Sequence, residues 1–231
     1  MSWAVSLALA TLAFVGTHLL MSHPLRPALV SRLGETGFLG AYSLVSLATL
    51  GWMVFAYRAG TDADPLWLAP LAWWPFASAI MLVASILLVG SLVRNPAFPH
   101  PGAASREIPP PRGVFAITRH PMNWSFMLWA LVHLSLSGSL RNVIVAGGIL
   151  ILAFVGSLGQ DRKKARLLGE SWRGWMARTS FVPFGALLAR RAPWRNAAPS
   201  PGALVGGVLL WAAVTSYHAP LVSPLGDLLS R

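Results

Sequence analysis

WAVSLALATLAFVGTHLLMS, residues 3–22, contains no Asp, Glu, Lys or Arg. An α-helix rises ~1.5 Å per residue, so a stretch of this length crosses the ~30 Å hydrocarbon layer of a bilayer. No basic residue precedes the stretch, and no small-residue cleavage site of the usual kind follows it. We therefore expect a retained first membrane helix rather than a cleaved signal peptide.

The rest of the chain repeats this apolar character. Of the 231 residues, 55% are hydrophobic and 11% are charged, which is typical of a polytopic membrane protein. The pattern predicts an all-α transmembrane bundle, formed as a single domain over residues 1–231. Gly138, with serines on both sides, predicts a tight hairpin between the fourth and fifth spans. Counting residues 3–22, about six spans are expected, the other five being 37–57, 70–93, 122–137, 140–158 and 202–222.

The positive charge is distributed unevenly between the loops. The net charge is +11, and residues 23–36, 94–121 and 159–201 hold 15 of the 18 Lys and Arg residues. The positive-inside rule makes 94–121 and 159–201 cytoplasmic connections and places both termini outside. Anionic lipid head groups are the partner that such loops predict. Nucleic acid is not expected, because no binding module accompanies the basic residues.

Residues 160–179 differ from the other connections. Leu167, Leu168, Trp172, Trp175 and Met176 recur at spacings close to three and four, with Arg and Lys at other positions. This pattern predicts a basic amphipathic helix lying at the inner membrane interface. The alternative is that the same apolar face packs on the protein itself.

Two histidines, His18 and His133, lie inside the apolar segments. An ionisable side chain at membrane depth is costly without a partner and is a candidate functional residue. A hydrogen bond to a neighbouring helix is the plain alternative. The chain has no cysteine, which excludes disulfides and thiolate-ligated metals, whereas two neutral imidazoles suit a haem iron.

The segment TRHPMNWSFMLWALVH, residues 118–133, places an aromatic and thioether stripe on one helical face. Such a stripe either packs in a core or lines a cofactor. A porphyrin between this face and that of His18 would have its propionates met by basic side chains at the inner edge. The residues expected to contact it are Trp129 on the stripe and Arg26, Arg32 or Arg119 at the edge.

The depths of the two histidines in the membrane do not match well. With the topology above, His18 lies ~6 Å from the inner end of its helix, whereas His133 lies ~18 Å beyond Pro121. His120, which is flanked by Arg119 and Pro121, therefore competes with His133 as the second axial ligand.

Three blocks carry a family resemblance: residues 16–57, which include RLGE and YSLVS, residues 115–138, which include TRHP, and DRKKA at 161–165. They resemble the NnrU family of bacterial membrane proteins, which is related to the 15-cis-ζ-carotene isomerases. The resemblance implies a bacterial inner-membrane location, haem b, and axial ligation by His18 and His133. It also implies cis–trans isomerisation of an apolar polyene by ligand exchange at ferrous haem.

One position departs from the isomerase pattern. Those isomerases have a cysteine where this chain has Ala130, so the redox switch attributed to that cysteine is not available here. The resemblance to the NnrU family also implies a second expectation, a non-enzymatic haem protein linked to nitric oxide or denitrification, with a diatomic gas as ligand.

A third expectation comes from a different enzyme class. TRHPMNW at 118–124 and LGESWRGWMARTSFVP at 168–183 resemble integral membrane methyltransferases that use S-adenosylmethionine. Glu170 would be the acidic contact to the cofactor, but Ser171 stands where those enzymes have a second glutamate.

Overall fold

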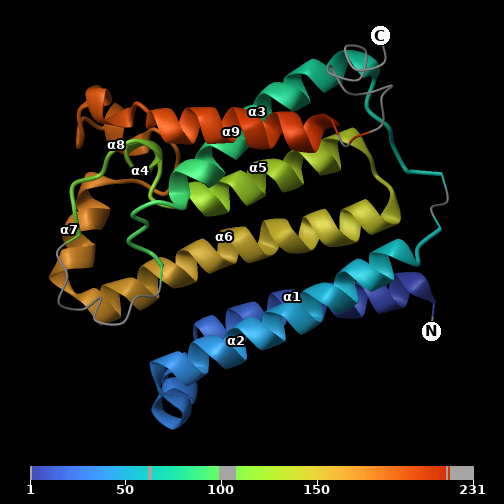
Figure 1. Cartoon of the computed structure of the whole chain (residues 1–231), viewed down its shortest axis with the longest axis horizontal. Coiled ribbons are helices and arrows are strands. Elements are labelled where there is room, and N and C mark those ends of the chain that lie inside the picture. The colour runs from blue at the N-terminus through green and yellow to red at the C-terminus, as the bar shows by residue number, and fades with distance from the viewer. Residues whose placement is uncertain (1, 62–63, 99–107, 217, 219–231) are drawn as a thin grey trace. The chain divides into compact units, whose positions relative to one another are not determined.

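The computed structural model describes residues 2–61, 64–98, 108–216 and 218, and the regular structure among them is helical (Figure 1). The chain forms two compact units. Unit 1 comprises Met1–Leu68 and His133–Lys163, and unit 2 comprises Ala69–Val132 and Lys164–Arg231. Each unit has a buried apolar cluster of its own.

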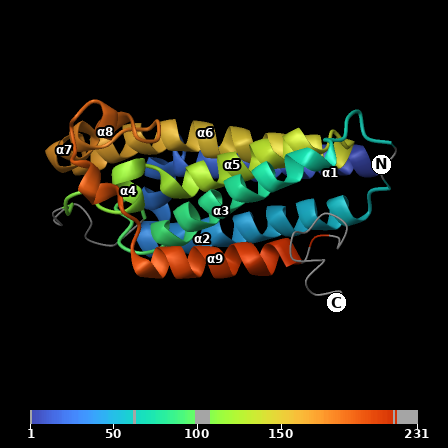
Figure 2. The same cartoon turned by 90° about the horizontal axis from the view of Figure 1, so that it is seen from above.

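Unit 1 is built on helices α1 (Trp3–Ser22) and α2 (Arg26–Arg58), which pack as an antiparallel pair (Figures 1 and 2). Gly34 interrupts α2 with φ 70° and ψ 170°, a backbone conformation open to glycine but not to other residues at ordinary cost. The regular part of α2 thus begins just before the predicted start of the second span. The buried cluster of unit 1 consists of Leu7, Ala10, Phe14, Met53 and Ala56.

Helix α6 (Leu140–Leu168) contributes its first 24 residues, 140–163, to unit 1. A Cβ atom added at Gly148 would meet the side chain of Thr11, and one added at Gly159 would meet the imidazole of His23. Since the residue numbers rise together, α1 and α6 run parallel. The two glycines let α6 approach α1 closely, as small residues do between membrane helices.

The predicted hairpin at Gly138 is confirmed, since it joins α5 (Pro121–Leu136) to α6. The connection after α2 is bound to this turn by three hydrogen bonds. Gly138 N donates to Trp67 O (2.9 Å), Leu66 N to Gly138 O (3.3 Å), and the Trp67 indole to Leu134 O (2.8 Å). The Trp67 ring covers Gly138 closely enough that a Cβ there would collide with it.

Unit 2 contains α3 (Trp74–Ser91), preceded by η1 (Leu71–Trp73), and α9 (Pro201–Ser216), which packs against α3. Gly206 and Gly207 of α9 face Val89 and Ile86 of α3 so closely that a Cβ atom on either glycine would force a shift. The shorter elements are α4 (Val114–Ile117), α7 (Glu170–Arg178), α8 (Gly185–Leu188) and η3 (Trp194–Ala197), and the first twelve residues of α5 also belong to this unit.

The all-α membrane fold is confirmed, but the number of about six spans is not. Among the residues that the structure describes, four helical segments have the length and composition to cross a membrane: Trp3–Ser22, Arg26–Arg58, Leu71–Ser91 and Leu140–Leu168. The predicted fourth and sixth spans form α5 and α9. Each has 16 residues, which is fewer than the ~20 that a helix needs to cross the hydrocarbon layer. Part of the predicted end of the sixth span lies outside the described residues.

The single amphipathic helix predicted over residues 160–179 is wrong. Helix α6 continues to Leu168, Gly169 turns the chain at φ 54°, and α7 follows as a separate helix. Trp172 and Trp175 are 0% and 2% exposed and form the buried cluster of unit 2 with Phe115 and Leu87. The apolar face therefore packs on the protein, which was the alternative to a membrane-facing helix.

Because α6 approaches α1 closely, we expect substitutions at two adjacent glycines to change the stability of the protein by very different amounts. Gly148→Leu must displace the β-branched Thr11 side chain, so we expect a loss of about 1–3 kcal/mol in the free energy of unfolding. Gly147→Leu is the matched control, because a Cβ at Gly147 meets nothing within 4 Å. Unfolding by sodium dodecyl sulfate in mixed micelles measures both. Equal losses for the two variants would contradict the close contact.

Candidate functional site

His18 lies on α1, four residues before the helix ends, and is half-buried. Its Nδ1 atom is 2.8 Å from the carbonyl oxygen of Phe14. A carbonyl oxygen accepts but does not donate, so Nδ1 carries the proton and Nε2 keeps its lone pair. This is the second hydrogen bond by which proteins orient a metal-binding imidazole.

Aromatic rings surround the imidazole of His18 within unit 1. The ring centroid of Phe14 is 4.2 Å away, and that of Tyr42 on α2 is 5.3 Å away, nearly perpendicular. The Phe38 ring, one helical turn before Tyr42, lies 6.0 Å from it. The imidazole is therefore held between α1 and α2 in an apolar setting.

A salt bridge lies at the end of this aromatic series. The Arg26 guanidinium is 5.4 Å from the centre of the Phe38 ring and 2.8 Å from a carboxylate oxygen of Glu35. Arg26 is the more buried partner, with 16% of its side chain exposed against 50% for Glu35. We refer to Phe14, His18, Arg26, Glu35, Phe38 and Tyr42 as the His18 cluster.

Within the His18 cluster, sequence reasoning selected His18 and Arg26 as site residues and missed Glu35, Phe38 and Tyr42. Phe38 and Tyr42 have the i, i+4 spacing that places side chains on one helical face, which was the signal available. Glu35 gave no such signal, because its contact with Arg26 spans the break at Gly34.

His133 lies near the end of α5, and its carbonyl oxygen accepts a hydrogen bond from the Asn142 amide at 2.7 Å. His133 is therefore at the level of the start of α6. The imidazole of His23, at the end of α1, lies against Gly159 of α6. His18 precedes His23 by five residues, and α1 and α6 run parallel, so His18 lies at the level of about residue 154 of α6. The twelve residues between these levels correspond to ~18 Å along α6.

That separation bears on the expected pair of axial ligands. Two imidazoles on opposite faces of one metal ion are held by bonds of ~2 Å each, so their nitrogens lie ~4 Å apart. The structure does not bring His18 and His133 together in this way. The depth mismatch inferred from the sequence is therefore present in unit 1, and axial ligation by both histidines stays a prediction.

His120 belongs to a buried segment of unit 2 that leads into α5. Thr118, Arg119 and His120 are 0%, 8% and 3% exposed, and the His120 ring lies 6.0 Å from that of Phe181. Trp129, the other expected cofactor contact on α5, is half-buried.

The same segment is tied to residues 179–181 by hydrogen bonds. Thr118 Oγ1 donates to Phe181 O (2.7 Å) and Arg119 N to Ser180 O (2.8 Å). Arg119 Nη1 also donates to Thr179 Oγ1 at 3.4 Å. Thr118 and Arg119 of the TRHP sequence thus anchor the start of α5, which is a structural role for these two polar residues.

Thr118 provides a direct test of this anchoring. Thr118→Val keeps the side-chain shape but leaves the Phe181 carbonyl without this donor, so we expect a loss of about 1–2 kcal/mol in the free energy of unfolding. Thr17→Val is the control, since Thr17 donates within its own helix to Ala13 O. Thermal unfolding in detergent compares the two, and an unchanged Thr118→Val variant would contradict the anchoring role.

Glu170, the residue expected to contact S-adenosylmethionine, lies at the start of α7 with 87% of its side chain exposed. Its carboxylate accepts a hydrogen bond from Arg173 (2.9 Å), and this bond and the nearby positive charge hold the pKa of Glu170 below its usual value. The pair is a local i, i+3 contact on the surface of α7. The methyltransferase hypothesis stays a prediction.

In the described part of the chain, no group of three or more His, Asp and Glu side chains is placed to hold a metal ion. The His18 cluster therefore offers one imidazole, flanked by aromatic rings, rather than a complete set of protein ligands. Such an arrangement suits a metal whose other ligands come from a macrocycle.

Comparison with known proteins identifies the family. The 15-cis-ζ-carotene isomerases of Arabidopsis thaliana and Zea mays, both chloroplastic, are each 30% identical to the chain over 79 residues. That alignment covers 34% of this chain but 22% of each relative. No solved structure matches the chain significantly. The family model described as NnrU protein matches residues 6–224, and the chain therefore belongs to the NnrU family.

Proposed function

We propose that this protein binds haem b in the membrane and that His18 supplies an axial imidazole. The observation that carries the proposal is the hydrogen bond between His18 Nδ1 and Phe14 O, which leaves Nε2 as the free ligand atom. The similarity to 15-cis-ζ-carotene isomerases is in keeping with it, since haem b is the cofactor that the family resemblance of the sequence implies.

The other members of the His18 cluster have roles that their positions support. Phe14 and Tyr42 restrict rotation of the imidazole and provide apolar surface for a flat macrocycle. Arg26 is the residue for a propionate, which would share the guanidinium with Glu35 or displace it. His133 is not part of this proposal as a ligand of the same iron, while His120 stays a candidate for the second axial position.

The proposed activity is cis–trans isomerisation of an apolar polyene. Haem supplies a ferrous iron that can donate electron density to a double bond and lower the barrier to its rotation. The chain itself holds the imidazole, excludes water with aromatic side chains, and accepts an apolar substrate from the bilayer. The buried Ala130, in place of the isomerases' cysteine, favours a second candidate in which haem binds a diatomic gas without isomerisation.

The absorption spectrum of the full chain, purified in detergent from haem-supplied cells, tests the proposal. We expect a haem Soret band and a pyridine haemochrome of b type. A colourless protein would overturn the proposal. Product analysis after adding a cis polyene to the reduced protein then tests isomerisation, and a shift of the ferrous spectrum by nitric oxide without product supports the gas-binding candidate.

A further inference from the structure

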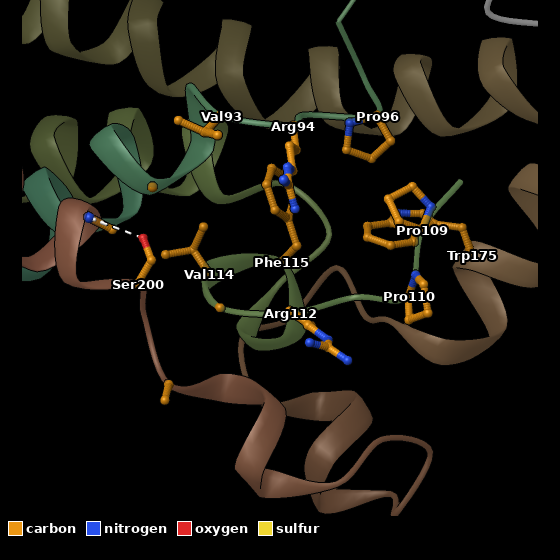
Figure 3. Close-up of a pocket in the computed structure, with 14 residues that line it drawn as sticks. Val93, Arg94, Pro96, Pro109, Pro110, Arg112, Val114, Phe115, Trp175 and Ser200 are labelled. Carbon is orange, nitrogen blue, oxygen red and sulfur yellow. Dashed lines mark hydrogen bonds between the residues drawn. The ribbon is translucent and has the colours of Figure 1, made fainter. Parts of the chain in front are cut away.

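A cavity of about 560 Å³ lies in unit 2, apart from the His18 cluster. It is bounded by the end of α3, the segment leading into α4, helix α7 and the start of α9 (Figure 3). Its volume is within the range of pockets that hold small organic ligands. The cavity is therefore a candidate binding site of its own.

The walls of the cavity combine apolar and cationic side chains. Val93, Val114 and Phe115 provide apolar surface, and prolines 96, 109 and 110 add more. Arg94 and Arg112 also line it, and in the described part of the chain neither guanidinium has a carboxylate or hydrogen-bond partner. The lining therefore suits a molecule with an anionic group and an apolar part.

Trp175 supplies a second, independent observation. It is 2% exposed, and its indole Nε1 has no hydrogen-bond acceptor among the described residues. Its side chain points from α7 into the space between Phe115 and the prolines (Figure 3). A buried donor without an acceptor costs about 1–3 kcal/mol, so a ligand oxygen at this place would recover a lost interaction.

The beginning of α9 adds to the same preference. Ser200 lines the cavity and its Oγ accepts from Ala203 N at 3.2 Å, which places the first turn of this 16-residue helix at the wall. The N-terminus of a helix carries partial positive charge and favours anions. Together with the two arginines, it makes the cavity electrostatically suited to a phosphate.

We propose that this cavity binds an anionic glycerophospholipid, with its phosphate held by Arg94 and Arg112 and the adjoining apolar part against Phe115 and Val114. The cavity lies at the end of α3, a helix long and apolar enough to cross the membrane, so lipid head groups are the anions present at that level. Charge complementarity with a chain of net charge +11 favours an anionic over a zwitterionic lipid.

Native mass spectrometry of the full chain, released from detergent with defined lipids, tests the proposal. We expect one phosphatidylglycerol to be retained in preference to phosphatidylcholine. The double variant Arg94→Gln, Arg112→Gln should weaken phosphatidylglycerol binding about tenfold or more. Arg195→Gln is the control, an exposed arginine of unit 2 that does not line the cavity.

A pair of tryptophan variants separates ligand binding from folding. Trp175→Phe keeps a six-membered aromatic ring and removes the unpaired N–H, so the packing cost in the lipid-free protein should be partly offset by the loss of the unsatisfied donor. Phosphatidylglycerol binding should nevertheless weaken about threefold to tenfold. Trp172→Phe removes an equally unpaired N–H that does not line the cavity, and it should leave binding unchanged.

Three results would overturn the proposal. The first is an equal loss of binding in Arg195→Gln and in the double variant, which would indicate general surface charge. The second is equal binding of the two lipids. The third is that inorganic phosphate alone, at millimolar concentration, stabilises the protein against heat as much as phosphatidylglycerol does, because the site would then take a free anion.

Discussion

His18→Ala is expected to abolish the haem Soret band of the purified protein, whereas His133→Ala retains it. The imidazole of His18 is fixed through Nδ1, faces Phe14 and Tyr42, and keeps Nε2 for a metal. Loss of the imidazole removes the coordinate bond that His18 would supply to the iron. We expect at least a hundredfold loss of haem affinity, which corresponds to ~3 kcal/mol.

Two further measurements make the His18 result specific. Exogenous imidazole added to His18→Ala should restore a low-spin haem spectrum, because it fills the volume that the side chain leaves. Phe14→Leu, which keeps the carbonyl acceptor, should retain haem. If His133→Ala lost the Soret band while His18→Ala kept it, the ligand assignment would be wrong, and loss in His120→Ala together with His18→Ala would identify the second axial ligand.

The largest effect on stability is expected for Trp172→Ala. Trp172 is fully buried in the cluster of unit 2, where Trp175, Phe115 and Leu87 also lie. Removing so large a side chain from a packed interior leaves a cavity and typically costs about 3–5 kcal/mol. The free energy of unfolding in mixed detergent micelles should fall by about this amount, and the yield of folded protein should fall with it.

Trp194→Ala is the matched control for Trp172→Ala. Trp194 is 56% exposed and stacks on Phe184 at a centroid distance of 6.1 Å, so its loss leaves no enclosed cavity. We expect a change below about 1 kcal/mol. Comparable losses in the two variants would show that α7 is not held through a buried tryptophan.

The apolar helices could be predicted from the sequence because their signal is local. The first helix has the predicted bounds, Trp3–Ser22, and the turn at Gly138 is where the glycine and serines indicated. The end of α6 could not be predicted from hydropathy. Five of the residues 161–168 are charged, but most of this stretch consists of the good helix formers Arg, Lys, Ala and Leu, so the helix continues beyond the apolar segment until Gly169.

The candidate site was harder to predict because it depends on contacts between helices. Hydropathy and spacing identified His18 as an unusual residue. Its hydrogen bond to the carbonyl oxygen four residues earlier follows from helix geometry. Its contact with Tyr42 depends on how α1 and α2 pair, which no local pattern in the sequence specifies. The pairing of His18 with His133 stays a prediction for a similar reason, because residues of like type on two helices need not share a level.

The hydrogen bonds between Trp67 and the α5–α6 turn have a consequence for the order of synthesis. Trp67 precedes its acceptor residue Leu134 by 67 residues. At ~5–20 residues per second, the ribosome therefore adds Leu134 ~3–13 s after it has added Trp67. During that interval the Trp67 N–H must be satisfied by water or lipid head groups. Formation of this hydrogen bond therefore indicates when the α5–α6 turn has packed against Trp67. An indole-specific probe at Trp67 would time this step in the assembly of unit 1 on the translating ribosome.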